Sequence, residues 1–171
     1  MKRKSFYGLL TSMLLVAASP GHAQSVTFNL TGNITQGTCN FTIPDGDLGT
    51  HPVSWFTGSR VTAWSNPIVI KAVSCSPDIQ NIRMTFIGTP DTSNGSYFAP
   101  VSTSGNVTGV AIELGQAGPL LTAGINPGSS LDWPLGTLGN SYSIHARFTQ
   151  TKPSVTPGVV KTPITVQFTY Y

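Results

Sequence analysis

The sequence predicts an all-β protein, an antiparallel β-sandwich for which an immunoglobulin-like arrangement is the leading candidate. Three observations support this prediction. Apolar residues alternate with polar ones along much of the chain, turn-forming residues separate the alternating segments, and charged residues make up only 9% of the 171 residues. Helical bundles and coiled coils draw heavily on Glu, Lys and Arg, so the single glutamate, Glu113, argues against them.

Each alternating segment places its apolar members on one face of a strand. Turn signals such as Pro44-Asp45-Gly46, Gly118-Pro119 and Asn126-Pro127-Gly128 lie between the segments. The stretch from Ser54 to Asn66 fits either a strand with a bulge or a packed loop. The alternating residues are Cys39, Phe41 and Ile43; Ile82, Met84 and Phe86; Val110, Ile112 and Leu114; Tyr142, Ile144, Ala146 and Phe148; and Ile164, Val166, Phe168 and Tyr170.

The first residues have the organisation of a secretory signal. Lys2, Arg3 and Lys4 precede an apolar run over residues 6–18, and small residues around Ala23 suit cleavage there. The run is too short to span a bilayer comfortably. We therefore expect residues 1–23 to be a signal peptide and the mature chain to begin at Gln24.

The basic residues of this leader account for the whole formal net charge of +3, so the mature chain is neutral. A neutral chain gives no electrostatic support for nucleic acid or an anionic membrane as a partner.

Cys39 and Cys75 are the cysteines of the chain, and an exported chain meets an oxidising compartment in which such a pair normally closes. A loop of about 35 residues closed by a disulfide is worth roughly 4 kcal/mol in the chain-entropy account. A metal site lacks ligands, because His51 and His145 stand alone and no Cys-x-x-Cys is present. We expect a disulfide and no cofactor.

The segment after the cleavage site alternates without a fault from Val26 to Thr35, and Gln36-Gly37-Thr38 then gives a flexible joint. It fits an ordinary first strand of its own domain, and it also fits a strand that pairs outside that domain. Burying its apolar side chains is worth roughly 6 to 12 kcal/mol, whereas fixing about ten backbone residues costs roughly 10 to 20 kcal/mol. Burial alone does not hold it, so its receptor is expected to be a sheet edge beside an apolar groove.

Taken together, these features resemble the pilin subunits of chaperone-usher fimbriae of the type 1 and P pilus group. The resemblance covers the whole chain. It rests on the leader, the alternating extension with Gly32 at its fourth inward position, the cysteine pair, the segment Gly109-Val110-Ala111-Ile112-Glu113-Leu114, and a last strand opened by Pro157-Gly158 and closed by Tyr170. Gly158 is the fourteenth residue from the C-terminus, a spacing that the family shares. Lys161 and Pro163 depart from the small or apolar residues that the family more often carries there.

The resemblance implies an incomplete immunoglobulin-like antiparallel β-sandwich that is completed by a donated strand. Residues 24–35 would be the N-terminal donor-strand extension and residues 36–171 the pilin domain. A periplasmic chaperone would first fill the groove, and at the outer-membrane usher the extension of a neighbouring subunit would replace it. The donor face would be Val26, Phe28, Leu30, Gly32 and Ile34; the groove edge and chaperone contact would be Gly158, Ile164, Val166, Phe168, Tyr170 and Tyr171 with its terminal carboxylate.

The expected function is therefore that of a structural subunit on the surface of a Gram-negative cell, polymerising by donor-strand exchange and contributing to adhesion, with a minor or adaptor position suggested by Trp55, Trp64 and Trp133. The alternative is a single-domain, lectin-like fimbrial adhesin that stacks sugars on these tryptophans. An enzyme is not expected, because the mature chain carries no recognisable base, nucleophile or carboxylate pair. No small-molecule substrate is expected either.

Overall fold

The computed structural model describes residues 29–33, 37–58, 61–117 and 124–171. The chain divides into two parts, residues 1–34 and 35–171. The predicted signal peptide lies outside the described residues. Within the first part, the described residues 29–33 form no strand, and the side chain of Leu30 is 88% exposed.

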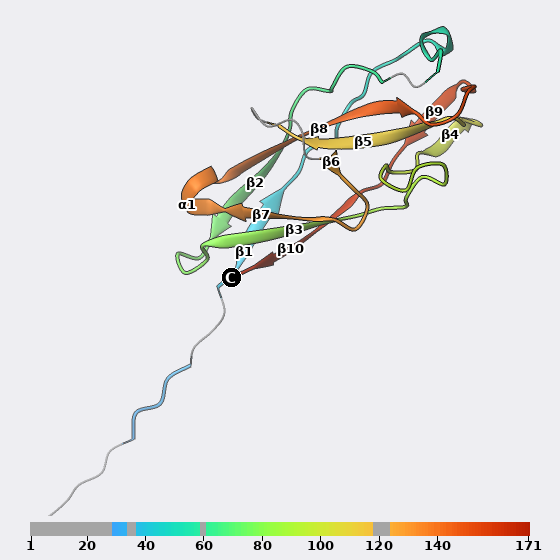
Figure 1. The fold of residues 1–171 in the computed structure, drawn as a ribbon. Coiled ribbons are helices and arrows are strands. Elements are labelled where there is room, and N and C mark those ends of the chain that lie inside the picture. The colour runs from blue at the N-terminus through green and yellow to red at the C-terminus, as the bar shows by residue number, and fades with distance from the viewer. Residues whose placement is uncertain (1–28, 34–36, 59–60, 118–123) are drawn as a thin grey trace, which may run out of the picture. The chain divides into compact units, whose positions relative to one another are not determined.

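The second part is built from antiparallel strands (Figure 1). Its five-stranded sheet has the order β1-β2-β8-β5-β6, its three-stranded sheet has the order β10-β3-β7, and β4 and β9 form a separate pair. The strands are β1 (Cys39–Thr42), β2 (Ile68–Cys75), β3 (Asn81–Ile87), β4 (Val101–Gly105), β5 (Val110–Gln116), β6 (Gly124–Ile125), β7 (Ser130–Pro134), β8 (Ser141–Gln150), β9 (Gly158–Lys161) and β10 (Thr165–Tyr170). A 3-10 turn, η1 (Val53–Trp55), and a one-turn helix, α1 (Leu135–Leu138), complete the elements.

The core lies between the five-stranded and three-stranded sheets. The inward residues of β3, which are Ile82, Met84 and Phe86, are fully buried, as the alternation predicts. Trp133 on β7 is also fully buried, and its indole Nε1 donates a hydrogen bond of 2.8 Å to the carbonyl oxygen of Gly139. This tryptophan is therefore part of the core.

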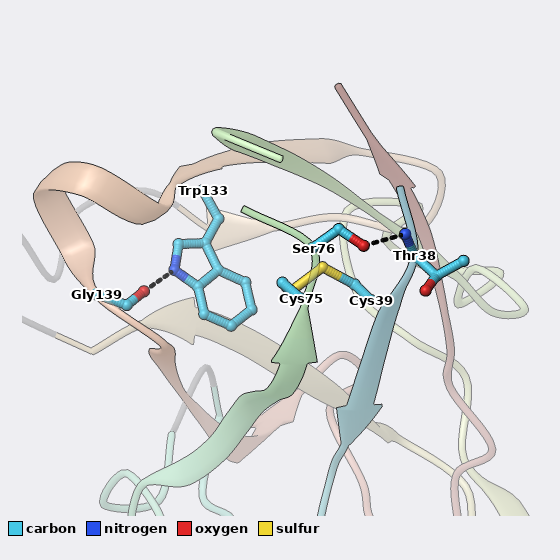
Figure 2. The surroundings of a disulfide bond; sticks show 6 residues. All are labelled: Thr38, Cys39, Cys75, Ser76, Trp133 and Gly139. Atoms are coloured by element: carbon cyan, nitrogen blue, oxygen red, sulfur yellow. Dashed lines mark hydrogen bonds between the residues drawn. A yellow bond between two sulfur atoms is a disulfide. The ribbon is translucent and has the colours of Figure 1, made fainter. Parts of the chain in front are cut away.

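The predicted disulfide is present. Cys39 and Cys75 face each other across the β1–β2 ladder and are bonded, and next to them Ser76 Oγ accepts a hydrogen bond from the backbone N–H of Thr38 (Figure 2). The bridge ties the start of β1 to the end of β2. It thereby fixes the place where the chain enters the sandwich.

Of the stretch from Ser54 to Asn66, residues 59 and 60 lie outside the described residues and its first residues belong to η1. The part from Val61 to Ser65 is an irregular continuation of β2 along β8. The N–H of Thr62 donates to the carbonyl oxygen of Phe148, and the N–H of Ser65 donates to that of Ala146. In return, Thr62 Oγ1 and Ser65 Oγ accept hydrogen bonds from the backbone of β8. Because side-chain hydroxyls replace main-chain carbonyls in this ladder, the segment shows no period of two.

Two predicted boundaries are wrong. The first strand ends at Thr42, so Ile43 lies beyond it and is 41% exposed. The expected single C-terminal strand from Gly158 to Tyr170 is two strands: β9 pairs with β4, and β10 pairs with β3. Residues 162–164 separate them, and Pro163 cannot donate a main-chain hydrogen bond that would continue a ladder. Ile164 therefore precedes β10 instead of belonging to it. In the described parts of the chain, no helix is long and apolar enough to cross a membrane.

Candidate functional site

An apolar groove of about 940 Å³ opens between the two sheets. Its floor consists of core-facing side chains of β5 and β8, including Ile112, Ile144 and Phe148, and Phe86 of β3 contributes as well. One wall is the segment of residues 43–53, and the other is formed by residues 155–164 and Val166. Its charged lining residues, Asp45, Asp47 and Lys161, are exposed. The interior thus suits an apolar occupant.

The inward row of β10 is incompletely covered. Val166, Phe168 and Tyr170 alternate with exposed residues, yet each is half-buried, whereas their partners Phe86, Met84 and Ile82 on β3 are fully buried. Ile164, just before the strand, is half-buried too. Both strands face the same core, so the difference comes from what lies beside β10. The sandwich lacks cover along this strand.

Both strands that flank the opening lie at sheet edges: β10 begins the order of the three-stranded sheet and β1 that of the five-stranded sheet. The hydrogen bonds of Phe86 on β3 show that main-chain groups of β10 point away from β3, toward the free edge of the sheet. Its N–H donates to Ser129 and its carbonyl oxygen accepts from Gly128, both on the β7 side. The facing residue on β10, Val166, therefore has its own N–H and carbonyl directed away from β3. An extended segment placed there would find a ready ladder.

One end of the groove is closed by two stacked rings. Phe41 of β1 and Phe168 of β10 lie with ring centroids 3.8 Å apart and planes 2° from parallel. Neither residue lines the groove, although Val166 does. The stack sits beside the Cys39–Cys75 bridge and the buried Trp133, whose ring centroid is 6.4 Å from that of Phe41. The open part of the groove thus runs from the β9 region to Val166.

The segment of residues 43–53 forms the opposite wall and is held by short-range contacts. Asp47 Oδ1 accepts a hydrogen bond from the N–H of Gly49, and the ring of His51 bonds to the carbonyl oxygen of Leu48 through Nε2. The ring of His51 also meets Phe148 edge-on at 5.9 Å. Sequence reasoning missed this wall because its apolar residues do not alternate; the turn signal at Pro44-Asp45-Gly46 was the available clue.

The residues expected at the groove edge occupy different positions. Ile164 and Val166 line the groove, Phe168 closes its end, and Tyr170 is half-buried at the end of β10. Tyr171 exchanges main-chain hydrogen bonds of 3.0 Å with Asn81, which extends the β10–β3 ladder. Gly158 opens β9 and lines the groove, in close contact with β4.

Of the expected donor face, Leu30 and Gly32 are described, and a Cβ on Gly32 would meet nothing within 4 Å. Val26, Phe28 and Ile34 lie outside the described residues.

The tryptophans contribute unequally to any exposed surface. Trp133 is buried, and Trp64 packs over Gly115 with the guanidinium of Arg147 4.1 Å from its ring centroid. Trp55 is 45% exposed. Among the residues that the structure describes, no group of His, Cys, Asp or Glu is arranged to hold a metal ion.

Comparison with known proteins identifies the family. The family model "Fimbrial protein" matches residues 28–171. The S-fimbrial adhesin protein SfaS of Escherichia coli O6:K15:H31 is 30% identical over 174 residues, covering 99% of both chains. The S-fimbrial protein subunit SfaG of the same strain is 29% identical over 118 residues, covering 67% of this chain and 66% of that relative.

Solved structures share the fold. The P pilus rod subunit PapA superposes with a TM-score of 0.63 at 19% identity, covering 86% of this chain and 99% of that one. A subunit from the structure of a chaperone-usher pilus gives a TM-score of 0.53 at 18% identity, covering 91% and 100% of the two chains. With the antiparallel sandwich, the disulfide and the family match in agreement, the chain belongs to the fimbrial protein family and is a structural subunit of a cell-surface fimbria.

Proposed function

We propose that this subunit polymerises by donor-strand exchange, in which the groove beside β10 accepts the N-terminal segment of a neighbouring subunit. The observation that carries the proposal is the inward row of β10, half-buried beside an apolar groove although the row of β3 opposite is fully buried. A strand laid along the free edge of β10 would cover that row and form a main-chain ladder at the same time.

The segment that suits this groove is the chain's own residues 24–35, as carried by the next copy or a relative. Its inward face, Val26, Phe28, Leu30, Gly32 and Ile34, is apolar or small and its outward face is Thr and Asn, so one side fits the groove and the other fits water. Leu30 is 88% exposed in this chain, which leaves a large apolar side chain to be buried by a partner.

Before assembly, an apolar groove beside a free strand edge is an aggregation hazard. In the proposed pathway a periplasmic chaperone fills it, with Ile164, Val166, Phe168, Tyr170 and Tyr171 as its contact and Gly158 at the far end. The outer-membrane usher is then the place where a neighbouring segment replaces the chaperone. Residues 1–23 would direct export, and no catalytic step is part of this role.

A charge placed on each face of the segment tests the proposal. Phe28→Asp puts a carboxylate on the inward face, where burial without a partner is costly, so we expect incorporation into fimbriae to fall at least tenfold. Asn29→Asp puts the same charge on the outward face and should assemble like the wild type. The measurement is immunogold counting of the subunit on isolated fimbriae, alongside its periplasmic level. Equal incorporation of the two variants into fimbriae would contradict the proposal.

A second candidate function is that of an adhesin. It is favoured by the relative SfaS, which is named an S-fimbrial adhesin protein and matches this chain along its length. Trp55, the last residue of the 3-10 turn, is 45% exposed and is the tryptophan best placed to stack on a sugar. A glycan array probed with whole fimbriae should then show specific binding that Trp55→Ala abolishes while fimbriae still form. Binding that survives this substitution would remove Trp55 from consideration.

A further inference from the structure

The loop that joins Pro90 to Phe98 carries an asparagine followed by a glycine at its tip. Pro90 and Phe98 form an isolated bridge at the base of the loop, and Phe98 is fully buried. Asn94 and Gly95, in contrast, are exposed. Asn94 is also the single asparagine of the sequence that glycine follows. The pair is therefore open to water at a place that the core does not hold.

Short-range hydrogen bonds hold this loop. The N–H of Asp91 donates to the carbonyl oxygen of Tyr97 and closes the loop, and Oδ1 of Asp91 accepts hydrogen bonds from the N–H groups of Ser93 and Asn94. At the tip, Oδ1 of Asn94 accepts a bond of 3.1 Å from the N–H of Ser96, and the carbonyl oxygen of Asn94 accepts one of 3.0 Å from that of Tyr97. Because these bonds all lie within one exposed loop, they can open without disturbing the core.

The backbone does not require glycine at position 95. The φ angle of Gly95 is not positive, unlike those of Gly105 and Gly109, and a Cβ on Gly95 would meet nothing within 4 Å. What glycine provides is an unshielded main-chain nitrogen next to the side chain of Asn94, because no Cβ stands beside that nitrogen. The distinguishing property of the pair is therefore the access of this nitrogen to the Asn94 amide.

We propose that Asn94 deamidates spontaneously in the folded subunit, so that position 94 is a modification site of the mature protein. The main-chain nitrogen of Gly95 attacks Cγ of Asn94, and the C–N bond that forms closes a five-membered succinimide ring. The side-chain amide leaves as ammonia, carrying the proton that the Gly95 nitrogen loses. Water then adds to one of the ring carbonyl carbons and breaks its bond to the nitrogen, which gives aspartate or isoaspartate. Nothing is oxidised or reduced.

The N–H of Ser96 is placed to assist the attack. It donates to Oδ1 of Asn94, the atom on which negative charge develops as Cγ becomes tetrahedral. Opening of the loop lets the Asn94 side chain reach the Gly95 nitrogen. The reaction therefore uses groups of the loop and water alone.

Deamidation changes both the charge and the main-chain length of the loop. A new carboxylate at position 94 lies close to that of Asp91, and the sequence places no Lys or Arg between Pro90 and Phe98 to offset their repulsion. Isoaspartate also adds a methylene to the main chain and disturbs the bond from Tyr97 to position 94. Because the expected mature chain is neutral, each modified subunit becomes negatively charged. A fimbria that contains this subunit then becomes more negative with time, which changes its approach to other charged surfaces.

Peptide mass mapping of the folded mature chain, incubated near neutral pH at body temperature, tests the site. Asn106 is the control within the chain, because it is exposed as well but is followed by the β-branched Val107. We expect Asn94 to convert to the carboxylate form about tenfold faster than Asn106, and enzymatic methylation to detect isoaspartate at position 94. Equal conversion rates at the two asparagines would overturn the proposal.

The same incubation in urea reports the reactivity of the pair without the folded loop. If Asn94 loses its amide in urea and keeps it in the folded chain, the loop protects Asn94 and the proposal is wrong.

Gly95→Ala is the matched variant for the attacking nitrogen. It should unfold at the same temperature as the wild type, because the added Cβ has room, and it should slow the conversion of Asn94 about tenfold. Equal conversion rates in the variant and the wild type would contradict the role assigned to Gly95.

Isoelectric focusing of subunits dissociated from isolated fimbriae tests the consequence for the organelle. Fimbriae stored after synthesis has stopped should accumulate an acidic form of the wild-type subunit that focuses with Asn94→Asp, and Gly95→Ala fimbriae should accumulate it more slowly. An unchanged wild-type pattern, over a period in which the free chain converts, would overturn the claim that fimbriae gain negative charge.

Discussion

At the scale of single residues, the groove is marked by inward-facing side chains that are only half-buried. Met84 and Phe168 are paired across the β3–β10 ladder, yet the first is fully buried and the second half-buried. Alternation in the sequence treats the two positions alike, since both are inward residues of apolar strands. It therefore predicted which residues face inward and gave no sign of how completely each is covered, which depends on the neighbouring strand.

Tyr142 offers a residue-level test of the packed side of the core. Burial raises its pKa above the ordinary value of 10.0, and its hydroxyl donates a 2.9 Å hydrogen bond to Gln116. A pKa higher in the folded than in the unfolded chain means that the stabilisation is intact below about pH 10 and is lost as the pH rises through the folded pKa. Above pH 10 the free energy of unfolding should fall more steeply for the wild type than for Tyr142→Phe, by up to about 1.4 kcal/mol per pH unit. Chemical denaturation at several pH values measures this, and parallel curves would contradict it.

At the scale of elements, five alternating segments correspond to strands, but the ends of the chain's C-terminal segment were harder to predict. The resemblance to chaperone-usher pilins places Gly158 at the start of the last strand, whereas it opens β9 in a different sheet. Pro163 between the two strands was the signal for the break. The short strands β4, β6 and β7 carry too few apolar residues to alternate visibly, and their pairing depends on contacts distant in sequence.

The junction of β4 and β9 yields a prediction at this scale. A Cβ on Gly158 would collide with the carbonyl oxygen of Ser104 and lie 2.7 Å from Cγ2 of Val107. The backbone at Gly158 therefore approaches the β4 region too closely for any side chain. Gly158→Ala should lower the free energy of unfolding by about 1 to 3 kcal/mol. Gly136→Ala, where an added Cβ meets nothing within 4 Å, is the control and should not destabilise the protein. Urea unfolding measures the free energy of unfolding of both variants. Similar losses of this free energy in the two variants would contradict the prediction, because a methyl group at Gly158 would then cause no extra strain.

At the scale of the whole molecule, β1 and β10 each lie at the edge of a sheet (Figure 1). The Phe41–Phe168 stack joins these two strands, and beyond it the groove lies between residues 43–53 and residues 155–166. The alternating segment after the leader pointed to an edge beside an apolar groove as its receptor, and this domain contains one. Which molecule fills the groove is not encoded in a local pattern, because the complementary surfaces belong to successive subunits.

The most direct measurement of the central claim is thermal unfolding of the mature chain at monomeric dilution, with and without a synthetic peptide of residues 24–35. An open groove predicts that the midpoint rises with peptide concentration, since a ligand that binds the folded state alone stabilises it by about 2.7 kcal/mol at a hundred times its dissociation constant. The same peptide with Phe28→Asp should give no rise. If the midpoint is unchanged by the wild-type peptide across the whole titration, the sandwich is already complete and the account is contradicted.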